Sequence, residues 1–118
     1  MDLSAKLQLK PDQAMQQVGA PATGVPALDG VGTPGGGSEP GAVLVFVNDR
    51  ATLEKRRAQI AKAAGADRLT WVAYPKAGKL GTDLNRDSLA ALLGENGIQP
   101  VRQVAIDEVW SALRFRPG

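Results

Sequence analysis

The sequence contains no cysteine and no histidine, and these two absences remove several classes of chemistry at once. Without cysteine the chain can form no disulfide, no thiolate metal site and no thiol nucleophile. Without histidine it lacks the commonest zinc ligand and the imidazole base of a Ser-His-Asp triad. No group of Asp and Glu has metal-ligand spacing either. We therefore predict no metal site and no catalytic residues.

Long hydrophobic runs and strong charge of one sign are also missing. No segment is long and apolar enough to span a membrane, and the first residues lack the apolar run of a signal peptide. We therefore expect a cytoplasmic protein that does not contact a membrane. The formal net charge is +2 with the signs interspersed, whereas a nucleic-acid surface needs a clustered basic stripe. No nucleic-acid partner is predicted.

The length of 118 residues is typical of one domain, so residues 1–118 are taken as a single unit. Within it the composition changes abruptly at residues 19–41, where 12 of the 23 residues are Gly or Pro. Such a stretch buries too little apolar area to offset the entropy of ordering it, which predicts a long loop that is either mobile or functional. Gly30 to Gly35 match the dinucleotide pattern G-x-G-x-x-G, but no strand precedes them and no helix follows. The match is therefore rejected.

Regular structure is predicted mainly after this loop. Ala42–Val47 is apolar at consecutive positions, which indicates a strand covered on both faces. Asn48 or Asp49 then caps a helix of about fifteen residues, and Gly65 ends it. A second strand follows at residues 69–74.

The rest of the chain predicts one more helix and two more strands. Thr82 or Asp83 caps the helix, and Asn96-Gly97 ends it. Val101–Ile106 is a third strong strand, and Trp110–Phe115 alternates as its half-buried antiparallel partner. The fold class is therefore α/β, with a mostly parallel sheet, two crossover helices and a C-terminal antiparallel hairpin.

Right-handed crossovers that progress in one direction place both helices on the same face of the sheet. Only the N-terminal third, with a short candidate strand at residues 14–18, remains to cover the opposite face. An apolar sheet face without a covering layer favours a partner. A homodimer, or another protein partner, is therefore predicted over the helix-free face.

The loop after the second strand offers the strongest candidate ligand site. Free backbone N–H groups and the dipole at a helix N-terminus favour an anion. Fixed polar side chains gather at the same place, and they are Lys76, Lys79, Thr82 and Arg86. The alternative is a solvated loop in which Arg86 pairs with Asp83, Asp87 or Asp107.

Two residues of the hairpin could line a pocket at this site. Trp110 could stack on a ring, although the simpler interpretation of Trp71 and Trp110 is that both lie in the core. Asp107 points away from its neighbour Glu108 in an extended segment, which argues against an acid–base pair. It more simply orders the turn or binds an arginine.

Three motifs resemble a bacterial family of short proteins, domain-of-unknown-function family 3052: residues 71–76, residues 82–87 and the long run of residues 104–115. The similarity covers residues 42–116. The family in turn resembles a truncated, degenerate class I methyltransferase, whose later strands end in a similar antiparallel hairpin. The resemblance thus implies a fold and no activity. The acidic, glycine-rich loop that holds S-adenosylmethionine in such enzymes has no match at Gly19-Ala-Pro21, so no cofactor is predicted.

These observations predict a non-catalytic binding or regulatory module that acts through a protein partner or self-association. The alternative is a small-molecule-binding protein, a vestigial transferase, with an anionic ligand at the 76–86 loop. A concave pocket lined by Trp at that loop would favour the alternative, whereas a flat surface would favour the first.

Overall fold

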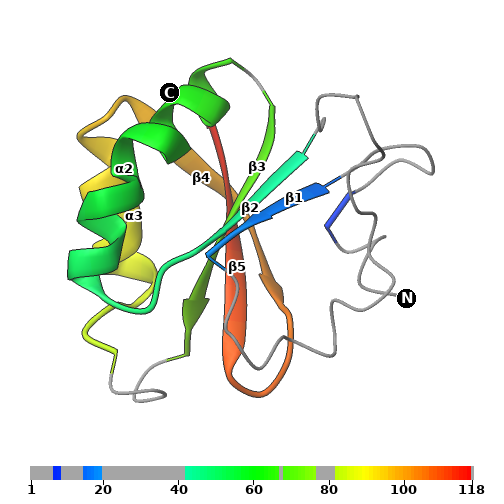
Figure 1. Ribbon diagram of the computed structural model, residues 1–118, viewed down its shortest axis with the longest axis vertical. Coiled ribbons are helices and arrows are strands. Elements are labelled where there is room, and N and C mark those ends of the chain that lie inside the picture. The colour runs from blue at the N-terminus through cyan, green and yellow to red at the C-terminus, as the bar shows by residue number, and fades with distance from the viewer. Residues whose placement is uncertain (1–6, 9–14, 20–41, 67, 77–81, 118) are drawn as a thin grey trace.

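The computed structural model describes residues 7–8, 15–19, 42–66, 68–76 and 82–117. They form one five-stranded mixed sheet with helices on one face (Figure 1). In chain order the elements are β1 (Met15–Val18), β2 (Ala42–Phe46), α2 (Arg50–Gly65), β3 (Leu69–Pro75), α3 (Arg86–Gly94), β4 (Ile98–Ala105) and β5 (Trp110–Pro117). Residues 20–41, most of the predicted mobile loop, lie outside the described residues.

The strand order is β1-β2-β3-β5-β4. β1 pairs parallel with β2 and β2 parallel with β3, whereas β5 pairs antiparallel with both β3 and β4. The predicted parallel pairing of β2 with β3 and the antiparallel hairpin are confirmed. The prediction of a mostly parallel sheet is wrong, because β5 inserts between β3 and β4 and makes two of the four pairings antiparallel.

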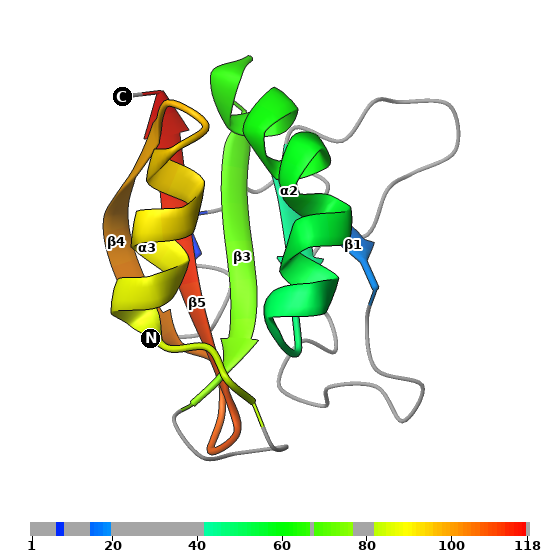
Figure 2. The same cartoon turned by 90° about the vertical axis from the view of Figure 1, so that its left-hand side faces the viewer.

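Helix α2 begins and ends where the sequence predicts. The Asp49 carboxylate accepts a hydrogen bond of 2.8 Å from the Thr52 N–H, so Asp49 is the N-cap, and Gly65 is the last helical residue. Both helices lie in front of the sheet in Figure 2, which agrees with right-handed crossovers that progress in one direction.

Helix α3 begins later than predicted. Its N-cap is Asn85, which forms a capping box with Ser88, and the predicted caps have other roles. Thr82 Oγ1 accepts from the Leu84 N–H at 3.0 Å, and Asp83 Oδ1 accepts from the Arg50 N–H at 2.9 Å. Asp83 therefore caps α2 from a distance in sequence.

The C-terminal end of α3 and the start of β4 also differ from the prediction. α3 ends at Gly94, and a turn follows in which Gly97 has φ 81°, a left-handed conformation that favours glycine. β4 then begins at Ile98, ahead of the predicted Val101.

Apolar side chains fill the space between the sheet and the helices. Arg57 closes the outer end of this layer and joins α2 to the C-terminal end of α3. Its guanidinium donates to the Leu92 carbonyl at 2.6 Å and to the Glu95 carboxylate at 3.0 Å. The hydrogen bond with Glu95, and to a lesser extent the Glu54 carboxylate, raise the pKa of Arg57. The core residues of this layer are Val43, Val45, Val47, Leu53, Ile60, Ala63, Ala64, Val72, Tyr74, Leu84, Leu89, Leu93, Ile98, Leu113 and Phe115.

The helix-free face of the sheet is buried as well. Leu7 packs in this layer, and its carbonyl accepts a hydrogen bond of 3.0 Å from the Trp71 indole N–H. Phe46 and Trp110 meet edge to face, with ring centroids 5.1 Å apart. The buried set is Leu7, Met15, Ala42, Leu44, Phe46, Leu69, Trp71, Ala73, Val104, Ile106, Trp110 and Ala112. The bare apolar face that motivated the predicted partner is therefore not present.

Candidate functional site

The predicted anion-binding residues lie at the carboxyl end of β3 and the start of α3. Lys76 follows β3 directly, and its backbone N–H donates to the Val109 carbonyl at 2.7 Å. Arg86 is the first residue of α3, with 54% of its side chain exposed, and its guanidinium lies 3.6 Å from the Asp87 carboxylate. Thr82 caps its own turn. Lys79 lies outside the described residues.

The two candidate pocket residues of the hairpin have structural roles. Asp107 Oδ1 accepts hydrogen bonds from the N–H groups of Val109 at 2.8 Å and Trp110 at 2.7 Å, and it thereby orders the turn. Trp110 is only 4% exposed and packs against Phe46. The simpler interpretation of each residue is confirmed, and neither lines the cavity described below.

The N-terminus of α2 also lies at this edge, and the chain supplies its own carboxylates there. Asp49 accepts from Thr52, and Asp83 accepts from Arg50. The hydrogen bonds from Thr52 hold the pKa of Asp49 below its ordinary value. Two carboxylates of the chain thus already accept hydrogen bonds from N–H groups at the N-terminus of α2, where an external anion would otherwise bind.

Arg56 occupies the space between the carboxyl ends of β1 and β2. Its guanidinium donates to the Phe46 carbonyl at 3.2 Å. It also lies over Gly19, whose φ is 74°, and a Cβ at that position would overlap the guanidinium. The left-handed backbone therefore favours Gly19, and a side chain there would displace the flexible end of Arg56.

Tyr74 is buried in the layer between the sheet and the helices. Its ring is 3% exposed, and its hydroxyl accepts a hydrogen bond of 3.2 Å from the Gln103 amide. Burial raises the pKa of Tyr74, while the charge of Arg86 opposes the shift.

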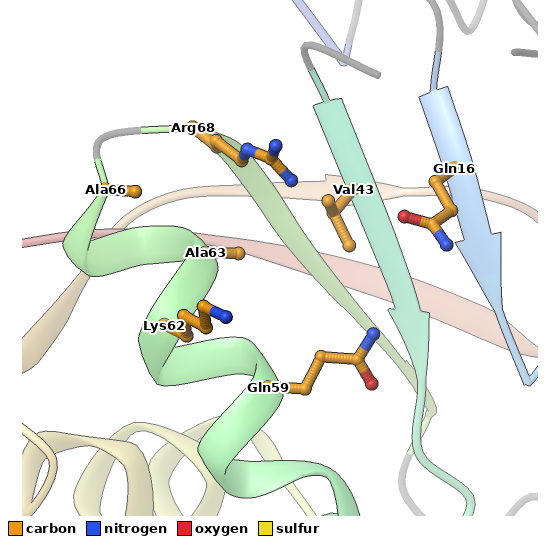
Figure 3. A pocket seen from close by; sticks show the side chains of 7 residues that line it. All are labelled: Gln16, Val43, Gln59, Lys62, Ala63, Ala66 and Arg68. Carbon is orange, nitrogen blue, oxygen red and sulfur yellow. The ribbon is translucent and has the colours of Figure 1, made fainter. Parts of the chain in front are cut away.

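A groove that the sequence did not predict lies at the opposite edge of the sheet, near the amino ends of β2 and β3. It runs between β1 and the second half of α2, has a volume of about 350 Å³ and has Val43 as its floor (Figure 3). Polar side chains from three elements extend into it, and α2 adds small residues. The lining residues are Gln16, Val43, Gln59, Lys62, Ala63, Ala66 and Arg68.

The sequence held part of the signal for this groove. Gln59, Lys62, Ala63 and Ala66 recur at helical spacing, which places them along one side of α2. Nothing in that periodicity says that β1 faces them across a gap, because Gln16 is remote in sequence.

The described residues contain no group of acidic side chains that could hold a metal ion. Among the same residues no helix has the length and apolar character needed to cross a membrane. Comparison of the chain with protein-family models, with curated proteins and with solved structures gives no match.

Proposed function

We propose that this protein is a non-catalytic binding or regulatory module that acts through a protein partner or self-association. One observation carries the proposal: three polar side chains at the carboxyl edge of the sheet bond to the backbone of that same edge. Arg56 bonds to Phe46, Asp83 to Arg50, and Asp107 to its own turn. Open α/β enzymes place their reacting groups at this edge. Here the three side chains are bonded to the backbone, so they are not available to act on a substrate.

The absence of histidine and cysteine supports the same proposal. With no histidine and no cysteine, proton transfer near neutral pH would need a carboxyl or lysine with a strongly shifted pKa. The one lowered carboxyl pKa belongs, among the described residues, to the helix cap Asp49. A cytoplasmic location is part of the proposal.

The partner surface is proposed to lie at a sheet edge rather than over the helix-free face. Within the described residues β1 has a neighbour on one side only, and its sequence Met-Gln-Gln-Val has no proline or charge to discourage strand pairing. The other edge strand, β4, is protected by Pro100 and by an irregularity between Pro100 and Arg102.

Two measurements test this proposal. Calorimetric titration with S-adenosylmethionine and with ATP should give no binding heat, and a micromolar dissociation constant for either would contradict the non-catalytic assignment. Sedimentation velocity should show concentration-dependent association that Gln17→Pro, which removes a backbone donor in β1, reduces. A protein that stays monomeric at millimolar concentration would exclude self-association and leave only the hetero-partner form.

The second candidate is a small-molecule-binding protein, a vestigial transferase with an anionic ligand at the 76–86 loop. It is favoured by Arg86, which is half exposed at the first turn of α3 and, among the described residues, is held by a 3.6 Å contact with Asp87. An antiparallel C-terminal hairpin, formed here by β4 and β5, is also what the resemblance to a degenerate class I methyltransferase implies.

The second candidate has its own test. Phosphate should shift the amide resonances of residues 76 and 82–87, and Arg86→Ala should weaken the response about tenfold, the loss of one charge-assisted bond. Asp87→Asn is the matched control, because it removes the neighbour of Arg86 and should strengthen the response. Equal affinities in all three proteins would exclude Arg86 as a ligand.

A further inference from the structure

The groove between β1 and α2 exists because the helix layer stops short of the sheet edge. α2 packs over β2 and β3, and β1 extends beyond it (Figure 2). Val43 and Ala63 close the bottom of the gap and are buried, whereas Gln16, Gln59 and Lys62 at its sides are exposed. The result is an open depression with an apolar floor and polar walls.

Four long polar side chains extend into this depression from different elements (Figure 3). Gln16 comes from β1, Gln59 and Lys62 come from adjacent turns of α2, and Arg68 precedes β3. Two of the four carry positive charge, and none of the described lining residues is acidic. The two amides can each donate and accept, so the walls offer several donors and a net positive potential.

The backbone around the groove does not supply the charge. The groove lies against the C-terminal half of α2, where the helix dipole and the last carbonyl oxygens are negative. An anion here must therefore be bound by side chains, chiefly Lys62 and Arg68. Arg68 has another interaction as well, so Lys62 is the cation through which the site is best tested.

From this arrangement we infer that the groove is a binding site for a small oxyanion, a carboxylate or a phosphate, carried on a compact molecule. A volume of about 350 Å³ lies near the lower end of the range for ligand pockets. Val43 and Ala63 accommodate a few carbon atoms, and the cations bind the charged group. This site is separate from the 76–86 loop and does not depend on the function proposed above.

The simplest other explanation for Lys62 is its place in the last turn of α2, where a cation interacts favourably with the helix dipole. That role affects stability and requires no ligand. A test must therefore measure binding and stability separately.

The test is a magnetic resonance titration of the full chain at constant ionic strength with inorganic phosphate, with succinate and with uncharged succinamide. Phosphate, succinate or both should give saturable shifts at residues 16, 43, 59–66 and 68, with a dissociation constant on the order of a millimolar. Succinamide should give none. The preference between phosphate and succinate distinguishes the two sources of oxyanion.

Variants of one helix provide the controls. Lys62→Gln should weaken binding about three- to tenfold and Lys62→Arg should restore it. Loss of the dipole interaction should lower the melting temperature of Lys62→Gln only slightly, so both variants remain folded during the titration. Lys55→Gln removes an equal charge from α2 at a position outside the groove, and it should leave the affinity unchanged. The inference is overturned if the groove amides show no saturable shift with either anion, or if Lys55→Gln weakens binding as much as Lys62→Gln.

Discussion

The two ends of the sheet use their polar side chains differently. At the carboxyl edge Arg56, Asp83 and Asp107 each bond to backbone atoms of neighbouring segments. At the amino edge Gln16, Gln59 and Lys62 extend into an open groove instead. The comparison teaches that a helix N-terminus or a cluster of charges does not identify a site until the partners of its polar groups are known.

The topology explains why the edges differ. β1, β2 and β3 follow one another in one direction, so no reversal of strand order opens a crevice at their carboxyl ends. Among the described residues, segments at that edge exchange hydrogen bonds, as Arg50 does with Asp83 and Lys76 with Val109. At the amino ends α2 lies over β2 and β3, and no helix of the described part of the chain lies above β1, which creates the groove.

Of the substitutions that compare the two edges, Trp110→Ala should cause the largest loss in the free energy of unfolding. The indole is buried at the carboxyl edge against Phe46, and its removal leaves a large cavity. The free energy of unfolding should fall by about 3–5 kcal/mol in chemical denaturation. Gln59→Ala in the groove serves as the comparison and should change it by less than about 0.5 kcal/mol. A Trp110→Ala protein of near wild-type stability would contradict the assignment of Trp110 to the core.

Asp107→Ala should give the next largest loss. One carboxylate oxygen accepts two backbone N–H groups of the hairpin turn, and alanine leaves both without that acceptor. We expect a loss of about 1–3 kcal/mol in the free energy of unfolding. Asp107→Asn keeps an acceptor oxygen and should lose less than half of this amount. A ligand-binding role for Asp107 would instead predict little change in stability with either variant.

Gly19→Ala tests the closure of the carboxyl edge by Arg56. The positive φ alone should cost about 1–2 kcal/mol of stability, and displacement of the flexible Arg56 guanidinium should add only the loss of its hydrogen bond to the Phe46 carbonyl. In an Arg56→Ala background only the backbone cost should remain. Additive effects of the two substitutions would show that Arg56 does not lie over Gly19.

The smallest expected effect is the dependence of stability on pH that arises from Tyr74. Burial raises the pKa of this phenol above the ordinary value of 10.0, so the neutral form is favoured in the folded chain. Its contribution to stability is therefore fully present below the unfolded pKa and is lost as the pH rises through the folded pKa. Tyr74 is the only tyrosine, so the phenolate absorbance reports it alone. A midpoint at 10.0 in the folded protein would contradict the burial, and Tyr74→Phe should remove this part of the alkaline loss.

Local signals predicted the elements that short-range chemistry determines. The uninterrupted apolar run of β2, the Asp49 cap and the stop at Gly65 predicted the first crossover unit. The antiparallel pairing of β5 with β4 was predicted correctly, but the half-buried character of β5 was not, because β5 lies inside the sheet and most of it is buried on both faces. The start of α3 was missed because Thr82, Asp83 and Asn85 can all cap a helix. Asp83 does not cap α3 because its carboxylate accepts a hydrogen bond from Arg50, a residue distant in sequence.

Features that depend on distant contacts could not be predicted. The insertion of β5 between β3 and β4 is a choice of neighbour that strand patterns do not encode. The burial of the helix-free face depends on residues such as Leu7, whose carbonyl meets Trp71. The groove arises where Gln16 on an edge strand faces α2, and composition at either position is unremarkable.

The most direct test of the difference between the edges is the anomalous scattering of bromide in soaked crystals of the full chain, because it locates anions at both edges in one map. The account predicts bromide in the groove beside Lys62, in molecules whose groove is free of lattice contacts, and none at the N-terminus of α2, where Asp49 and Asp83 already bind. An empty groove together with ordered bromide at the N-terminus of α2 would contradict it.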